Sequence, residues 1–231
     1  MAQVMISIII PVLNEAAIIK QTIEKLQQHS ESEIIVVDGG SQDQTVTIAQ
    51  QTTAKVFTVT GTNRAGQMNA GADMAQGELL LFLHADTQLP LHFEKLIIST
   101  LKQPKVVAGA FELAIDGTDK SLRWVEILVK LRSHLLSLPY GDQGIFISKQ
   151  AFFMSGGFAT IPIMEDFEFI QRIKKQGRIA IAPGLVTTSG RRWQKLGVWQ
   201  TTLVNQLIIA GYYLGIPPAK LGDFYRSRGK R

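Results

Sequence analysis

The chain has 231 residues, of which 45% are hydrophobic and 19% are charged, and it contains no cysteine. This length suits one α/β domain with a sizeable core, and the composition excludes a disordered chain. Without cysteine, the chain has no disulfide, thiolate zinc site, iron–sulfur cluster or cysteine nucleophile. The start MAQVMISIII has no basic segment before a cleavage site, and no apolar run reaches about 18 residues, so we expect neither a signal peptide nor a transmembrane helix.

The net charge of +5 is unevenly distributed. Residues 1–170 contain 12 Lys+Arg and 18 Asp+Glu, whereas residues 171–231 contain 12 Lys+Arg and one acid, Asp223. A basic C-terminal quarter indicates an anionic partner, either phosphate groups, an acidic membrane surface or nucleic acid. The alternative is a solvated basic tail without a partner.

The first hundred residues alternate between strand-like and helix-like patterns. Continuous apolar or β-branched runs predict strands at 6–10, 34–37, 56–59 and 79–83. Apolar periodicity and small-residue runs predict helices at 15–28, 43–52 and 65–75. Asn14 and Asp43 are expected to cap the helices that follow them. Continuous apolar strands separated by helices are typical of a parallel sheet with helices on both faces.

Beyond residue 100 the pattern loosens. Strands are predicted at 106–113 and 144–147, and helices at 121–138, 165–176 and 196–216. Pro183-Gly184 is interpreted as a turn. Because no linker, repeat or low-complexity segment interrupts the chain, we expect one domain with a C-terminal helical extension.

Polar residues gather where the predicted parallel strands end. The first strand is followed by Asn14 and Glu15, the second by Asp38, and the fourth by His84 and Asp86. Ligands of such sheets bind outside the carboxyl ends of the strands, where these side chains meet. An acid-bearing rim suits sugar hydroxyls, a nucleotide or a cation, although each group alone is also typical of a turn or a helix cap.

Taken together, these motifs resemble the family 2 glycosyltransferases with the GT-A fold, over about residues 5–180. The matching segments, in the family's order, are PVLNE (11–15), DGGSQDQT (38–45), NRAGQMNAG (63–71), LHAD (83–86), GDQGIF (141–146), GGF (156–158) and MEDFEFIQRIKKQG (164–177). They look most like a short bacterial subset of the family. A dehydrogenase is disfavoured because GxGxxG does not follow the first strand.

The resemblance implies a Rossmann-like, mostly parallel α/β sheet with helices on both faces. One glycosyltransferase domain over residues 1–231 would then divide into three parts. We expect a nucleotide-sugar-binding half at 1–110, an acceptor and catalytic half at 111–190, and a basic, amphipathic C-terminal helical extension at 191–231.

The resemblance also implies a nucleotide-sugar donor, with a UDP- or GDP-sugar expected. Asp38 would accept hydrogen bonds from the base or ribose. Guanidinium groups suit a diphosphate, although a solvated surface role is the alternative for each arginine. The residues expected to contact the donor are Pro11, Val12, Glu15, Asp38, Arg64, Asn69, Arg191 and Arg192.

Two carboxylates carry the expected chemistry. Asp86 would bind a divalent cation, Mg²⁺ or Mn²⁺, that stabilises the leaving diphosphate as a Lewis acid. The family's DxD motif is reduced here, because His84 replaces its first acid. Asp166 would be the general base, since an acceptor hydroxyl must lose its proton and one carboxylate suffices for inversion. Glu165 is a weaker candidate, and both acids also suit a helix N-terminus.

The sequence thus predicts an inverting, metal-dependent glycosyltransferase that moves one sugar to an acceptor hydroxyl, with a lipid-linked acceptor as one option. One alternative is a nucleotidyltransferase acting on a sugar phosphate, which would carry a glycine-rich basic loop where PVLNE stands. Another is a non-catalytic nucleotide- or nucleic-acid-binding protein, whose polyanion the acidic rim would repel. We therefore expect no nucleic-acid partner.

Residues 196–216 combine apolar, aromatic and uncharged polar side chains, with Lys195, Lys220 and Arg226 on either side. This composition is typical of a helix that lies on an anionic membrane. We therefore expect a cytoplasmic protein, peripheral at the inner face of the membrane and acting in cell-envelope or lipid glycosylation. A helix packed on the protein, or a homodimer contact, is the alternative.

Overall fold

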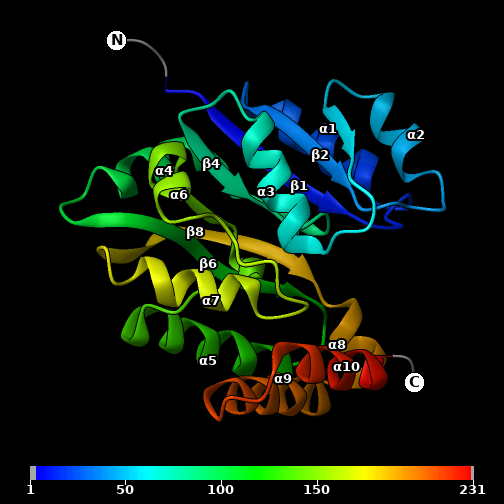
Figure 1. The fold of residues 1–231 in the computed structure, drawn as a ribbon, viewed down its shortest axis with the longest axis vertical. Coiled ribbons are helices and arrows are strands. Elements are labelled where there is room, and N and C mark those ends of the chain that lie inside the picture. Colours follow the sequence, from blue (N-terminus) through cyan, green and yellow to red (C-terminus); the bar gives the residue numbers. More distant parts are fainter. Residues whose placement is uncertain (1–3, 230–231) are drawn as a thin grey trace.

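The computed structural model describes residues 4–229, whose strands form one mixed sheet in the order β3-β2-β1-β4-β7-β6-β8-β5 (Figure 1). The strands are β1 (Ile6–Val12), β2 (Glu33–Asp38), β3 (Lys55–Thr58), β4 (Leu79–Phe82), β5 (Thr87–Gln88), β6 (Val106–Asp116), β7 (Ile145–Ser148) and β8 (Arg178–Ser189). β1 pairs in parallel with β2 and β4, and β2 with β3. β7 runs antiparallel to both β4 and β6, and β8 runs parallel to β6.

Residues 4–229 also form ten α-helices and one 3₁₀ turn, η1, of which α8, α9 and α10 follow the last strand. The helices are α1 (Ile19–His29), α2 (Thr45–Gln50), α3 (Arg64–Met74), α4 (Phe93–Leu101), α5 (Ser121–Leu136), α6 (Lys149–Met154), α7 (Glu165–Ile173), α8 (Arg191–Leu196), α9 (Val198–Tyr213) and α10 (Pro218–Gly229), with η1 at Gly141–Gln143. α5, α9 and α10 lie together at the lower edge of the view in Figure 1.

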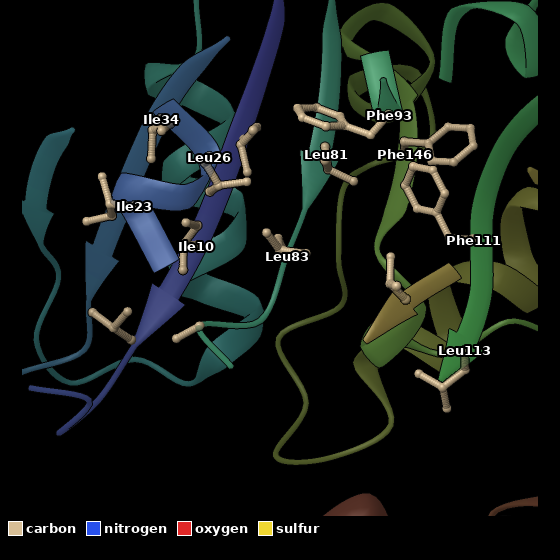
Figure 2. Close-up of a cluster of buried hydrophobic side chains, with 14 of the residues drawn as sticks. Ile10, Ile23, Leu26, Ile34, Leu81, Leu83, Phe93, Phe111, Leu113 and Phe146 are labelled. Carbon is tan, nitrogen blue, oxygen red and sulfur yellow. The ribbon is translucent and has the colours of Figure 1, made fainter. Parts of the chain in front are cut away.

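Two apolar clusters cover the two faces of the sheet. Side chains alternate across a strand, so Ile8 and Ile10 of β1 enter one cluster and Ile9 enters the other. The first cluster packs the sheet against α1 and α4 (Figure 2) and also against α2 and α5. The second cluster packs the sheet against α3, α6 and α7. This double burial explains the continuous apolar strands and confirms the predicted α/β sheet with helices on both faces.

Asn14 does not cap α1, which begins four residues later than predicted. Asn14 has φ +56° and its side chain accepts a hydrogen bond from the Gln42 amide at 2.8 Å. The amide of Glu15 donates to Thr45 Oγ1 at 2.8 Å. These bonds tie the segment after β1 to the loop after β2 and hold it out of a helix, so Ile18 occupies the N-cap position.

Asp43 was also expected to cap a helix, and Gln44 occupies that position instead. The Asp43 carboxylate nevertheless accepts from the Thr45 amide at 3.0 Å, in the first turn of α2, and from the Ala16 amide at 3.2 Å. Asp43 therefore satisfies amides of two separate segments, which a local capping rule does not anticipate.

In the C-terminal third, one expected feature is wrong. The expected turn at Pro183-Gly184 lies inside β8, as an irregularity in its pairing with β6, where Phe111 faces Ala182 and Glu112 faces Leu185. The expected helix over 196–216 is confirmed as α9 over Val198–Tyr213, with Gly197 at φ +85° separating it from α8 and Gly215 at φ +76° following it. No helix within residues 4–229 is long and apolar enough to cross a membrane.

Candidate active site

A cleft of about 300 Å³ opens beyond the carboxyl end of β4 and is closed on the other side by the C-terminal helices. Its charged lining residues and one histidine come from five parts of the chain: Arg64, His84, Asp86, Asp142, Asp166 and Arg192. The sheet order explains this convergence, because ligand-binding loops of an open α/β sheet meet at the carboxyl ends of its parallel strands.

Asp166 lies in the first turn of α7 and lines this cleft. Its Oδ2 accepts a hydrogen bond from the Gly141 amide at 2.7 Å, and its Oδ1 accepts from the Phe167 amide at 2.7 Å. A Cβ at position 141 would lie 3.0 Å from Asp166 Oδ2 and 3.2 Å from His84 Nε2, so this close approach favours glycine. Each carboxylate oxygen keeps a further lone pair with which it can accept a proton.

Glu165 has a different place from its neighbour. It is buried, and its Oε1 lies 2.5 Å from Nε of Arg64 at the start of α3. Nη1 of Arg64 in turn lies 3.1 Å from Nε2 of His84. Glu165 thus fixes the guanidinium of Arg64 in the cleft wall, whereas the Asp166 carboxylate lines the cleft itself.

His84 is uncharged at neutral pH. Burial and the nearby Arg64 guanidinium lower the pKa of His84 to about 3. The neutral imidazole nitrogen Nε2 then accepts the hydrogen bond that Arg64 donates. With this lone pair in use, His84 does not replace the missing first carboxylate of the DxD motif as a metal ligand through Nε2.

Asp86 follows β4 and faces the guanidinium of Arg191. Nη2 of Arg191 lies 3.3 Å from Asp86 Oδ2 and 3.6 Å from Glu15 Oε2. Burial raises the pKa of Glu15, and Asp86 adds to this, while Arg191 opposes it. Two carboxylates therefore meet one positive charge at this point of the cleft rim.

The residues near Asp86 suit a divalent cation that is held partly by the protein and partly by its ligand. No group of three His, Cys, Asp or Glu side chains within residues 4–229 is placed to hold a metal ion. Mg²⁺, however, commonly takes one or two protein carboxylates and completes its shell with phosphate oxygens and water. Asp86 supplies one such carboxylate, so the donor set suits a cation that binds together with a diphosphate.

The residues expected around the nucleoside lie beside this rim. Val12 and Asp38 end β1 and β2 as partners in the parallel register, and Pro11 pairs with Val37 one step earlier. The buried Asp38 carboxylate accepts from the amides of Gly40 at 2.9 Å and Ser41 at 3.0 Å, which shapes the loop after β2.

Among the residues expected to contact the donor, Asn69 forms its side-chain hydrogen bonds away from the cleft, and Arg191 and Arg192 have different partners. Both ends of the Asn69 side chain are engaged by the backbone of Phe158, with Nδ2 donating at 2.8 Å and Oδ1 accepting at 2.9 Å. Asn69 therefore ties α3 to the loop after α6 and does not line the cleft. Arg191 and Arg192, adjacent in sequence, point apart: Arg191 faces Asp86, whereas the guanidinium carbon of Arg192 lies 3.8 Å from the ring centroid of Tyr225.

Asp142 is a candidate site residue for which the sequence analysis assigned no role. Its Oδ1 is buried without a hydrogen-bond partner. Two further atoms of residues in the cleft wall, Arg192 Nε and Trp193 Nε1, are also buried and have no hydrogen-bond partner. Burial raises the pKa of Asp142 to about 6, against the opposing attraction of Arg132. Unsatisfied buried polar atoms in a cleft wall mark groups that a ligand can satisfy. The GDQGIF motif located this residue, but its burial arises from tertiary packing.

The family model described as Glycosyl transferase family 2 matches residues 7–162. This is more than half of the chain, and the chain therefore belongs to glycosyltransferase family 2. A PGL/p-HBAD biosynthesis glycosyltransferase of Mycobacterium bovis is 37% identical over 97 residues. That match covers 38% of this chain and 38% of the relative, so the two share well under half of their lengths.

Solved structures share the fold. A mannosyltransferase of Pyrobaculum calidifontis, in complex with GDP-Man and Mn²⁺, aligns with a TM-score of 0.61 at 21% identity over 79% of this chain and 56% of its own. TarS 1–349 of S. aureus, in complex with UDP-GlcNAc, aligns with a TM-score of 0.63 at 16% identity over 80% of this chain and 58% of its own. These likenesses confirm the predicted GT-A-like architecture.

Proposed function

We propose that this protein is an inverting glycosyltransferase that moves one sugar from a nucleotide-sugar donor to an acceptor hydroxyl. The convergence of Asp86 and Asp166 in one cleft of a family 2 chain is the observation that carries the proposal. The donor would be a UDP- or GDP-sugar, as bound by the two structural neighbours.

The donor is assigned to the rim formed by β1, β2 and β4. Pro11, Val12 and Asp38 are placed at adjoining strand ends, which supports a nucleoside site there. Arg191 adds a positive charge beside Asp86, where a diphosphate would bind. When bound at Asp86, a divalent cation would stabilise the negative charge of the leaving diphosphate.

The acceptor is assigned to the side of Asp166. In the reaction, the acceptor oxygen bonds to the anomeric carbon, the bond from that carbon to the diphosphate breaks, and the hydroxyl proton goes to the Asp166 carboxylate. The Gly141 amide holds this carboxylate in the cleft wall. Asp142, with its unpartnered Oδ1, is placed to accept a hydrogen bond from a sugar or acceptor hydroxyl.

Replacing Asp166 with Asn tests this assignment, because Asn keeps the size of the side chain and cannot take the proton. Transfer, or donor hydrolysis in its place, should fall by about 10²–10⁴-fold, while calorimetric donor binding stays near wild type. Asp73→Asn, an exposed acid-to-amide change on α3, is the matched control. Transfer by Asp166→Asn at the wild-type rate would assign the proton to another group.

We also propose that the protein binds the surface of an anionic membrane, because α9 has an outward apolar stripe. Trp199, Leu203 and Leu207 follow one another at a spacing of four residues and are 65%, 60% and 49% exposed. α9 contains no charged residue, while Lys195 and Lys220 lie just beyond its two ends. An apolar helix face flanked by basic residues suits the surface of an anionic bilayer.

α5 carries a second apolar stripe and contacts α9 (Figure 1). Its inner face packs Leu122 and Val125 into the core, whereas Trp124, Leu128 and Leu135 are 62%, 55% and 74% exposed. Single exposed apolar side chains are common on protein surfaces, but contiguous apolar patches over two neighbouring helices are not, and they indicate a binding surface. A lipid-linked acceptor would reach the cleft from such a surface.

A further inference from the structure

A second pocket, of about 290 Å³, adjoins the active-site cleft. Four residues, Arg64, Ile163, Arg192 and Tyr225, line both hollows and form the boundary between them. The second pocket also extends to Arg226 of α10, a helix that follows the segment matched by the family model. The donor assignment uses no residue of α10, so this pocket is not explained by the reaction as described.

The pocket is rich in positive charge, with three arginines in its lining and one acid, Glu165. Glu165 is already committed to Arg64, whose Nε it meets at 2.5 Å. Arg226 is paired at 2.7 Å with Asp223, which is 77% exposed and therefore a weak partner in water. The positive charges of Arg192 and Arg226 are thus largely uncompensated.

Arg192 has the feature that points to a ligand. Its Nε is buried and has no hydrogen-bond partner, although a buried donor of this kind is normally satisfied. The stacking on Tyr225, at 3.8 Å from the ring centroid, fixes the plane of the guanidinium without using any of its N–H groups. The group is therefore oriented in advance, with donors free for an anion.

The donor diphosphate is served by a different arginine. Arg191 is paired with Asp86 and does not line the second pocket, whereas Arg192 lies on the boundary between that pocket and the cleft. Ile161, Pro162 and Ile163 line the second pocket on its apolar side. An anion bound there would place an apolar group against these side chains and its negative charge against the arginines. A phosphate monoester meets both requirements, because its ester group is organic and guanidinium groups match phosphate oxygens in geometry and charge.

We infer that the pocket between α8, α10 and the start of α7 binds a phosphate monoester carried by the acceptor, through Arg192 and Arg226. This inference rests on the proposed glycosyl transfer and adds the chemical class of the acceptor to it. The same chemistry would come from a lipid phosphate or from a soluble phosphate ester, and the test separates these two sources.

The test is calorimetric titration of the full chain with glycerol phosphate and, separately, with decyl phosphate below its micelle concentration. We expect binding of at least one probe, and tighter binding of decyl phosphate if the source is a lipid. Arg226→Gln should weaken the binding by about tenfold, the effect of losing one hydrogen bond to a charged group. Arg228→Gln removes the same charge from the same helix outside the pocket and should leave the affinity unchanged.

A second arm distinguishes the pocket from the donor site. Titrations are repeated with GDP or UDP and Mn²⁺ at saturation, and the phosphate probe should still bind. Full displacement of the probe by nucleotide would overturn the inference, as would equal losses in Arg226→Gln and Arg228→Gln, or no binding of either probe. Nucleotide binding itself is measured in the same titrations, so a failure of the proposed glycosyl transfer is seen separately.

Discussion

Replacing Asp142 with Asn should stabilise the protein at neutral pH. Burial raises the pKa of Asp142 to about 6 from its usual 3.8. Between these two values the folded protein keeps a proton that the unfolded chain has lost, so stability falls as pH rises through this range. Two pH units at ~1.36 kcal/mol each correspond to a loss of about 3 kcal/mol, complete above pH 6. Asn carries no charge and escapes that loss.

Thermal unfolding at several pH values measures this effect. For a domain of this size, each kcal/mol changes Tm by roughly 2–4 °C, so Asp142→Asn should raise Tm by about 5–10 °C at pH 8. The gain should shrink as pH falls and vanish near pH 4, where wild-type Asp142 is protonated. Asp73→Asn, at an exposed position on α3, serves as the control and should change little.

The reasoning is refuted if Asp142→Asn has the wild-type Tm at pH 8, or if its gain persists unchanged at pH 4. A stabilised variant with slower transfer would further indicate that the buried charge serves the reaction, because active sites commonly retain groups that destabilise the fold.

Two further predictions concern the metal and the membrane. Asp86→Asn should abolish the part of nucleotide binding that depends on Mn²⁺, and equal calorimetric affinities with and without EDTA in both proteins would argue against a metal at this position. Leu203→Ser should reduce sedimentation with anionic liposomes. The control Leu91→Ser changes a side chain that is 64% exposed in the loop before α4, and it should leave sedimentation unchanged. If Leu203→Ser sediments like the wild type, or if it converts an oligomer to a monomer in solution, the stripe serves contacts other than a membrane.

The parallel part of the fold could be predicted from the sequence because its signals are local. The apolar runs in β1, β2 and β4 mark strands buried on both faces, and the polar residues after them mark one rim. That rim holds Asp86 in the observed cleft, and the family motif at the start of α7 places Asp166 there as well.

What the sequence did not predict depends on contacts between distant segments. Asn14 resembles a helix cap, but its partner is the amide of Gln42. Pro183-Gly184 resembles a turn, but pairing with β6 carries the chain through it as one strand. Asp142 carries no local mark of burial, and its raised pKa results from the packing of the cleft. Local rules fail where tertiary hydrogen bonds or long-range pairing supply the larger free energy.

The antiparallel strand β7 brings a second loop to the cleft, next to the chain that leaves β4. Phe82 of β4 faces Ile145 of β7, so the chain leaving β4 and the chain entering β7 meet at the same edge. Asp86 arrives at the cleft from the first direction, and Gly141 and Asp142 arrive from the second. In the proposed function, donor and acceptor recognition are therefore assigned to stretches about fifty residues apart in sequence. Under that assignment, substitutions in the loop before β7 would alter acceptor recognition while the pairing of β1, β2 and β4, and with it the proposed donor rim, stays the same.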